Sequence, residues 1–235
     1  MGAPSAEASR QRELKICRWL NAVADDATEI YLMGDIFDFW FEYSKVVPKG
    51  YVRLLATLAQ LTDKGIKITT FKGNHDMWMF GYLEKECGVA IVSNELIIER
   101  NNKRLYLHHG DGLGSGDFSY KMLRYIFRSR VCQWLFARLH PNAGIGLANF
   151  LSRKSRISQK DRYEQYLGDE KEILTQFCKQ TLLKEHYDYF VFGHRHLVLD
   201  IDLNGKSRYI NTGEWVHGSS YACFNGTKLE VYTFD

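Results

Sequence analysis

Four short polar motifs, each following an apolar run, contain the residues of this chain that could do chemistry. They combine aspartate, asparagine and histidine with an adjacent glycine, whose missing Cβ lets the backbone approach other groups closely. Carboxylate, amide oxygen and imidazole are ligands that suit a hard or borderline divalent cation such as Mn²⁺, Zn²⁺ or Fe²⁺. The motifs therefore predict a metal-dependent hydrolase. They are Gly34-Asp35-Ile36-Phe37-Asp38, Gly73-Asn74-His75-Asp76, His108-His109-Gly110-Asp111 and Gly193-His194-Arg195-His196.

The apolar runs before the motifs are β-branched and aromatic, which is typical of buried strands. They cover residues 30–33, 66–71, 105–107 and 189–192. Each strand would present its motif from a turn, so we expect the polar side chains to lie at the same edge of a sheet. Taken singly, each motif has an ordinary explanation as a helix cap, an Asx turn or a core histidine. The four together favour a metal site.

The order Gly-Asp-x-x-Asp, Gly-Asn-His-Asp, His-Gly-Asp and Gly-His-x-His resembles the calcineurin-like metallophosphoesterase superfamily. The resemblance implies an α/β fold, a two-sheet βαβ sandwich, with a two-metal site at the carboxyl ends of the strands. It makes Asp35 the ligand that bridges both metals. It also places Asn74, His109 and His194 on one metal and His196 on the other.

The same resemblance makes Asp35 and His75 the catalytic residues. A carboxylate bridge can hold two cations close enough to share a hydroxide and to spread the charge of an in-line phosphoryl displacement. His75 would lie beside the reacting phosphoryl group, where it stabilises the transition state or gives a proton to the leaving group. Asp38, Asp76 and Asp111 are expected to orient the imidazoles and turns, and ordinary turn aspartates are an equally good interpretation.

The composition fits one large domain covering residues 1–235, since 45% of the residues are hydrophobic. Five scattered cysteines without a CxxC pair suit a reducing cytoplasm, and no apolar stretch has the length of a membrane span. The net charge is only +3, but residues 121–156 hold eight Lys and Arg and no Asp or Glu. An anionic partner is therefore expected at this segment.

Between the third and fourth motifs, residues 117–168 are predicted to form an inserted helical lid. Apolar residues have helical spacing in 117–130 and 131–139, His140-Pro141-Asn142 ends the helix, and 161–185 predicts one long polar helix. Three interpretations stay open: a subdomain that packs on the sheet, a nucleic-acid groove, or an amphipathic lid for acyl chains at an anionic lipid surface. Leu, Ile, Phe and Trp outnumber Tyr in the insert, which favours hydrocarbon over bases. We expect no nucleic-acid partner.

Four further segments resemble the UDP-2,3-diacylglucosamine hydrolases. That resemblance implies Mn²⁺-dependent cleavage of the pyrophosphate of UDP-2,3-diacylglucosamine into UMP and 2,3-diacylglucosamine 1-phosphate, in lipid A biosynthesis. It implies a cytoplasmic protein attached peripherally to the inner membrane. The segments are Gly34–Trp40, His109–Asp111, Gln133–Phe136 and Asn211–Trp215, and the substrate-binding residues would be Asn74, His75, Asp117, Ser155, Arg156, Lys160 and His194.

Two departures from this pattern leave alternatives open. The best-known branch carries Arg at the position of His75, which leaves acid catalysis and charge stabilisation both possible there. The superfamily also opens with a strand and Asp-x-His, two further ligands, and no such motif precedes Asp35. If Met1 is the native start, we expect one tightly bound Mn²⁺ instead of two, and little activity. The alternatives are another phosphodiesterase or phosphatase of the superfamily, or a catalytically impaired binding module.

Overall fold

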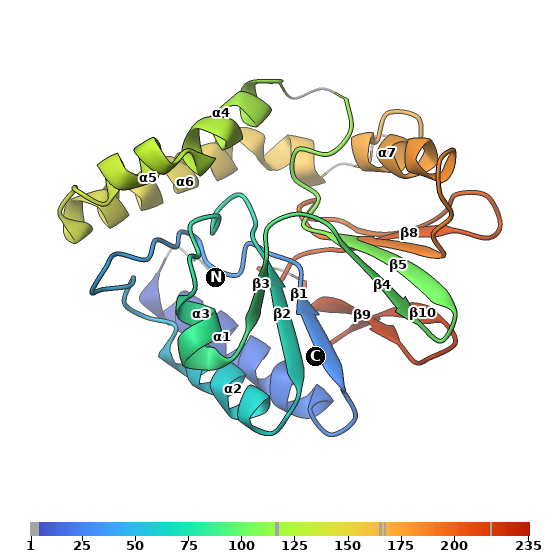
Figure 1. The fold of residues 1–235 in the computed structure, drawn as a ribbon, viewed down its shortest axis with the longest axis horizontal. Helices are drawn as coiled ribbons and strands as arrows, with labels where there is room; N and C mark the ends of the chain where they lie inside the picture. Colours follow the sequence, from blue (N-terminus) through green and yellow to red (C-terminus); the bar gives the residue numbers. More distant parts are fainter. Residues whose placement is uncertain (1–4, 116–117, 165, 167, 217) are drawn as a thin grey trace. The chain divides into compact units, whose positions relative to one another are not determined.

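The computed structural model describes residues 5–115, 118–164, 166, 168–216 and 218–235, with the backbone alone at 119 and 153–164. The chain forms two compact units (Figure 1). The first unit contains the residues up to Ser93 together with Arg124–Arg156. The second unit contains Asn94–Leu123 and Ile157–Asp235.

The sheet of the first unit has three parallel strands in the order β1-β2-β3. They are β1 (Glu29–Leu32), β2 (Lys67–Phe71) and β3 (Ala90–Val92). Leu32 lies beside Thr70 in the parallel register, so the chain leaves β1 and β2 at the same edge of this sheet. The two predicted strands at 30–33 and 66–71 are thus confirmed, and the first two motifs are neighbours.

Helices α1 (Ala6–Val23), α2 (Val52–Asp63) and α3 (Tyr82–Cys87) belong to the same unit. The first turn of α2 begins after Tyr51, which has a φ of 56° and offers no side-chain cap. A carboxylate oxygen of Glu13, on α1, instead accepts hydrogen bonds from the backbone N–H groups of Arg53 (2.9 Å) and Leu54 (3.2 Å). The buried Glu13 therefore stabilises the positive end of α2 from another helix.

Aromatic packing anchors the inserted helices α4 (Phe118–Arg128) and α5 (Arg130–Phe136). The ring of Phe136 lies 4.8 Å from the rings of both Phe41 and Trp78, measured between centroids. The indole N–H of Trp78 also donates to the carbonyl of Phe127 at 2.7 Å. Phe127 and Phe136 are therefore packing residues of the first unit.

The helical stretch predicted over 117–139 is found in the described residues as two helices, α4 and α5, because Ser129 caps the start of α5. The predicted stop at His140-Pro141-Asn142 is only partly right, since α6 (Pro141–Glu164) already begins at Pro141. The prediction of one helix over 161–185 is wrong. Instead, α6 ends at Glu164 and α7 (Ile173–Leu182) follows separately. Gly168, with a φ of +86°, lies between them in a conformation that no right-handed helix contains.

The second unit has a five-stranded sheet in the order β4-β5-β6-β8-β7, with β5, β6 and β8 parallel. A core of aromatic and apolar side chains, including Phe190, Phe192 and Tyr209, packs with Leu174 and Cys178 of α7. Because β5 and β6 are parallel neighbours, the third and fourth motifs also leave one sheet edge together. The strands are β4 (Leu96–Arg100), β5 (Lys103–His108), β6 (Tyr189–Phe192), β7 (Val198–Asp202) and β8 (Arg208–Thr212).

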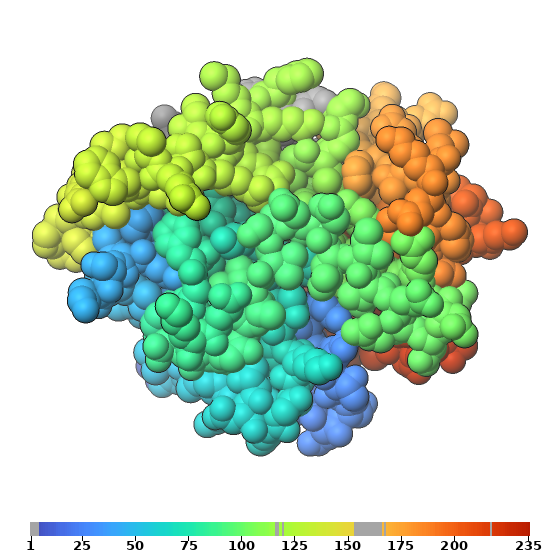
Figure 2. Space-filling model, in the orientation of Figure 1, coloured from blue at the N-terminus to red at the C-terminus, as the bar shows by residue number. Residues whose placement is uncertain are grey.

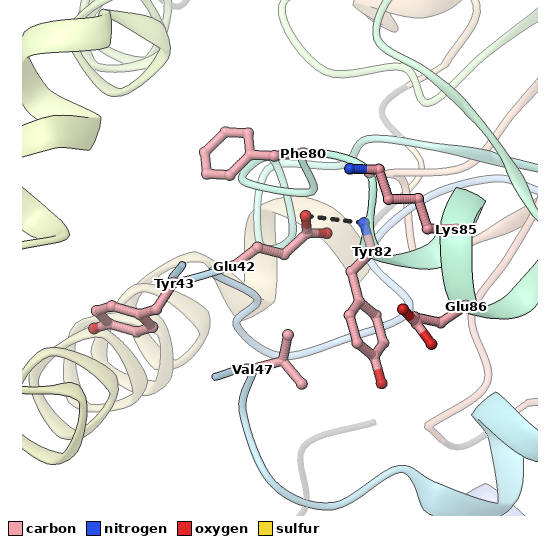
Figure 3. A pocket seen from close by; sticks show the side chains of 8 residues that line it. Glu42, Tyr43, Val47, Phe80, Tyr82, Lys85 and Glu86 are labelled. Carbon is pink, nitrogen blue, oxygen red and sulfur yellow. Dashed lines mark hydrogen bonds between the residues drawn. The ribbon is translucent and has the colours of Figure 1, made fainter. Parts of the chain in front are cut away.

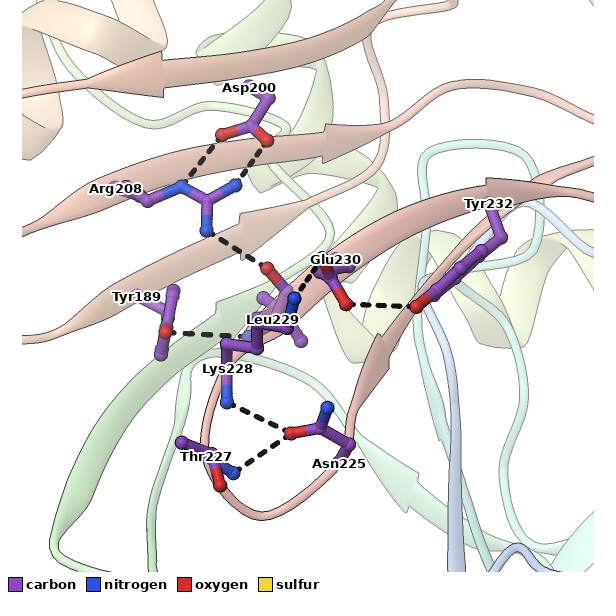
Figure 4. A network of polar contacts seen from close by, with 9 residues as sticks. All are labelled: Tyr189, Asp200, Arg208, Asn225, Thr227, Lys228, Leu229, Glu230 and Tyr232. Atoms are coloured by element: carbon purple, nitrogen blue, oxygen red, sulfur yellow. Dashed lines mark hydrogen bonds and ion pairs between the residues drawn. The ribbon is translucent and has the colours of Figure 1, made fainter.

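A hairpin of β9 (Ser220–Phe224) and β10 (Leu229–Thr233) completes the second unit. Figure 4 shows how polar contacts join it to the five-stranded sheet. Arg208 donates to the carbonyl of Leu229 at 3.0 Å and pairs with Asp200 of β7, while the hydroxyl of Tyr189 accepts from the N–H of Leu229 at 3.4 Å. The backbone groups of Leu229 in the hairpin thus have hydrogen-bond partners outside the β9–β10 pairing.

Candidate metal centre

Asp35 and Gly73 interlock the first two motifs. Asp35 has a left-handed backbone with a φ of 54°, and its Oδ1 accepts a hydrogen bond from the N–H of His75 at 2.8 Å. A Cβ on Gly73 would lie 2.1 Å from that same Oδ1, so only glycine fits beside the carboxylate. The two turns therefore depend on each other's sequence.

The carboxylate of Asp76 accepts hydrogen bonds from both turns. It is fully buried, and it accepts hydrogen bonds from the N–H groups of Gly73 at 2.8 Å, Ile36 at 2.8 Å, Asp35 at 3.3 Å and Phe37 at 3.4 Å. An ionised carboxylate is the side chain that can accept this many bonds, because it has about four lone-pair sites. The expected role of Asp76 in orienting these turns is confirmed.

In the second unit, the imidazoles of His109 and His194 lie together. Their ring centroids are 5.2 Å apart at an interplanar angle of 68°, and a nitrogen of each lies within 4.8 Å of one on the other. A Cβ on Gly110 would lie 3.1 Å from the Cβ of His194, so glycine allows the third motif to approach the fourth. Two imidazoles at this separation fit the ligand set of one divalent cation.

The neighbours of His109 have structural contacts of their own. Nδ1 of the buried His108 accepts a hydrogen bond from the N–H of Gly110 at 2.7 Å, which commits this histidine to the turn. The buried carboxylate of Asp111 accepts from the hydroxyl of Tyr120, on α4, at 2.6 Å. His108 therefore has a structural hydrogen bond within the turn, whereas the imidazole of the predicted ligand His109 lies beside that of His194.

Residues 12–198 match the family model of the calcineurin-like phosphoesterases. The chain belongs to the calcineurin-like phosphoesterase family. That membership confirms the predicted α/β fold class and makes the protein a metal-dependent hydrolase.

Several curated proteins similar to this phosphoesterase are named UDP-2,3-diacylglucosamine hydrolase. The protein from Porphyromonas gingivalis is 37% identical, with the alignment covering 95% of this chain and 90% of that protein. The protein from Aeromonas salmonicida is 27% identical over 93% of this chain and 86% of its own length, and that from Proteus mirabilis is 25% identical over 92% and 90%. Among the described residues, no helix is both long and apolar enough to cross a membrane.

The phosphoesterase's His75 contacts α6. Its Nδ1 lies 2.9 Å from the hydroxyl oxygen of Ser152, and that hydroxyl donates to the carbonyl of Asp38 at 3.1 Å. A hydroxyl has a single proton, so when it is donated to Asp38 the imidazole must donate from Nδ1. In the neutral ring, Nε2 is then the acceptor. The sequence did not indicate Ser152, because one serine in a basic segment carries no spacing signal.

Of the remaining predicted site residues, two have side chains that the structure describes and four do not. Asn74 is half-buried and His196 is exposed, each within the turn that the sequence predicted. Asp117 lies outside the described residues. Ser155, Arg156 and Lys160 lie on α6, and their side chains are likewise outside what the structure describes.

A cavity of about 300 Å³ opens in the first unit (Figure 3). The carboxylate of Glu42 lies in its wall and accepts from the N–H of Tyr82 at 3.0 Å and from the indole of Trp40 at 3.1 Å. No predicted site residue lines this cavity. Its lining residues are Glu42, Tyr43, Val47, Phe80, Gly81, Tyr82, Lys85 and Glu86.

Proposed function

We propose that this phosphoesterase hydrolyses the pyrophosphate bond of UDP-2,3-diacylglucosamine, releasing UMP and 2,3-diacylglucosamine 1-phosphate for lipid A biosynthesis. The observation that carries the proposal is the 37% identity over 95% of the chain to the Porphyromonas gingivalis protein of that name. The relatives from Aeromonas and Proteus, which carry the same name, also align over more than nine-tenths of the chain.

The proposed metal ligands are Asp35, Asn74, His109, His194 and His196, and the proposed metal is Mn²⁺. Mn²⁺ accepts the carboxylate, amide and imidazole donors that these residues offer. Bound cations would supply Lewis-acid polarisation and a nucleophile at neutral pH. Asp35 would contribute the negative charge of the set, while the neutral imidazoles add none that would repel a phosphate substrate.

The proposed role of His75 is to contact the reacting phosphoryl group, with Nδ1 hydrogen-bonded to Ser152. Anchoring one nitrogen orients the ring, as in other sites where a side chain holds a histidine in one tautomer. The proposed substrate contacts are those assigned from the sequence: Asn74, His75, Asp117, Ser155, Arg156, Lys160 and His194.

Helices α4 and α5, yellow-green in Figure 2, present many exposed apolar side chains. Tyr125 is 79% exposed, Val131 69% and Trp134 56%, within the segment 121–156 that carries eight cations and no carboxylate. Apolar residues beside cations suit acyl chains next to anionic headgroups. We therefore propose that 117–168 is a lid for the acyl chains, with peripheral contact at the cytoplasmic face of the inner membrane.

A matched pair of substitutions tests the lid. Leu135 is 56% exposed on α5, and Leu183, at 87%, is an exposed leucine of the second unit. We expect Leu135→Asp to reduce UMP release from UDP-2,3-diacylglucosamine by about 10-fold or more, since burying a charge against acyl chains is costly. Hydrolysis of a small aryl phosphodiester should stay within about twofold, because surface substitutions away from a site have small effects. Leu183→Asp should leave both rates unchanged.

Other outcomes would favour the alternatives. Equal losses on both substrates would show that Leu135 supports folding and does not contact lipid. Hydrolysis of the aryl diester without any UMP release would point to another phosphodiesterase of the family. Tight binding of single-stranded DNA, weakening steeply with salt, would identify the basic segment as a nucleic-acid groove.

A further inference from the structure

Arg195, the residue between the two histidines of the fourth motif, points into the protein. Its side chain is 10% exposed and its guanidinium donates to the carboxylate of Glu172, which is 2% exposed, at 2.8 Å. Glu172 is the N-cap position of α7, yet its side chain makes no capping hydrogen bond. Glu172 and Arg195 therefore form a buried ion pair.

Stability alone does not account for such a pair. Removing two charges from water costs several kcal/mol each, and well-packed apolar residues in their place are often neutral or stabilising. A buried ion pair does, however, fix geometry, because the guanidinium and the carboxylate have few arrangements that satisfy both. Arg195 belongs to the turn that carries His194 and His196, so the ion pair connects this turn to Glu172.

That turn is strained. His194 has a φ of 64°, and the N–H of Arg195 donates to the carbonyl of Gly193 at 2.7 Å. An i to i+2 hydrogen bond around a central residue of positive φ is the rare, strained form of γ-turn. A non-glycine residue stays in such a conformation only where its surroundings hold it.

The surroundings of the turn are rigid elements of the second unit. The N–H of Gly193 donates to the carbonyl of His109 at 2.9 Å, and the side-chain amide of Asn211, on β8, donates to the carbonyl of Gly193. Helix α7, which follows Glu172, places Leu174 and Cys178 in the core of the unit. Glu172 is thus fixed to a packed helix, and Arg195 joins that helix to the turn.

We propose that Glu172, acting through Arg195, is a positioning residue that holds the His194 turn so that the imidazoles of His194 and His196 are presented together to a divalent cation. The inference rests on the proposed ligand role of these histidines. It adds a residue that touches neither cation nor substrate, 22 to 24 positions before them in the sequence.

The test compares folding with metal binding in the full chain. The double variant Glu172→Met/Arg195→Met removes both charges with little change in volume, and we expect its melting temperature in EDTA to stay close to that of the parent. Its Mn²⁺ dissociation constant should rise about 10-fold or more, the usual cost of losing the partners that orient ligands. In the metal-free variant, the protection factor of the amide at residue 195, which corrects for the different intrinsic exchange rates of Met and Arg, should fall, because the turn loses its anchor.

A control and a second variant keep the outcome decisive. Asp200→Asn breaks the Arg208–Asp200 pair of the same sheet and should leave Mn²⁺ affinity unchanged. If the double variant does not fold, Glu172→Gln keeps the size of the side chain and an oxygen that can accept from Arg195. Its melting temperature should fall, because the guanidinium loses its counter-charge, and its Mn²⁺ dissociation constant and the exchange at residue 195 should rise as in the double variant. Parent-like Mn²⁺ affinity in a folded variant, or an unchanged protection factor for the amide at residue 195, would overturn the proposal. A parent that binds no Mn²⁺ would instead refute the proposed ligand set, and the metal-free exchange would still decide the positioning role.

Discussion

The two units hold their motif turns by different means. In the first unit, one carboxylate, Asp76, accepts four backbone N–H groups and ties the Asp35 and Gly73 turns together. In the second, the turn of His194 is held by Asn211 of β8, by the backbone of His109, and by Arg195 paired to Glu172. The first arrangement is encoded within the motifs themselves. The second depends on residues from separate elements, so its geometry is sensitive to changes far along the chain.

The largest effect is expected at Asp35. Replacing it with Ala removes the carboxylate from the proposed ligand set, and hydrolysis should fall by about 10³-fold or more, since the set loses its negative charge. Asp35→Asn keeps an oxygen for the N–H of His75 but no negative charge, so its activity should fall almost as far. Melting curves in EDTA would check that both variants fold. Activity surviving in Asp35→Asn would show that the turn, and not the charge, matters.

Asp76→Ala should be the most destabilising substitution among the turn residues. Four N–H groups lose their acceptor in a buried site, and we expect the free energy of unfolding to drop by about 3–5 kcal/mol. Urea denaturation followed by circular dichroism measures this loss. A loss below about 1 kcal/mol would mean that water replaces the carboxylate, and that the first unit does not rely on it.

Asn211→Ala should have a smaller effect, because several elements share the task in the second unit. The carbonyl of Gly193, the N–H of Gly213 and the hydroxyl of Tyr209 each lose a neutral hydrogen bond to Asn211, which together costs about 1–3 kcal/mol of unfolding free energy. The same urea titration compares it with Asp76→Ala. Equal losses in the two variants would remove the contrast between one central carboxylate and a distributed set of contacts.

The smallest effect is expected at Asp188, beside the opposite end of β5 from His108. Burial raises the pKa of this carboxyl, but hydrogen bonds from Lys103 (2.8 Å) and from the N–H of Arg104 (2.9 Å) outweigh it and lower the pKa below its ordinary 3.8. A lowered pKa contributes stability above the unfolded-state value, and that contribution is lost as the pH falls through the folded-state value. We expect Asp188→Asn to cost about 1 kcal/mol at pH 7 and progressively less below about pH 4, with Mn²⁺ affinity unchanged.

Much of this architecture could be predicted from spacing. The runs at 30–33, 66–71, 105–107 and 189–192 form β1, β2, β5 and β6, because buried β-branched and aromatic residues before a glycine have few other solutions. The sequence did not predict that these strands pair two by two, β1 with β2 in one sheet and β5 with β6 in another. It led us to expect all four motifs at the same edge of one sheet. Partners across the chain were equally invisible: Glu13 at the start of α2, Ser152 at His75 and Glu172 at Arg195 are single residues without periodicity.

The local breaks were missed for a different reason. Helical spacing continues from Asp161 toward Glu185, and a polar sequence of this kind shows no point at which a helix must end. Among the residues described between α6 and α7, Gly168 has a left-handed backbone that a right-handed helix cannot contain. That separation matters, because it leaves Glu172 as the residue before a new helix, where it meets Arg195.

The most direct measurement is hydrolysis of UDP-2,3-diacylglucosamine in oxygen-18 water, with and without Mn²⁺, followed by mass spectrometry of both products. We expect water to attack the phosphorus on the UMP side of the pyrophosphate. UMP should then carry the label and 2,3-diacylglucosamine 1-phosphate should not, even if turnover is slow. EDTA should abolish the release of both products, and Mn²⁺ should restore it. Label in the lipid phosphate, product release that persists in EDTA, or intact substrate in the presence of Mn²⁺ would contradict the account.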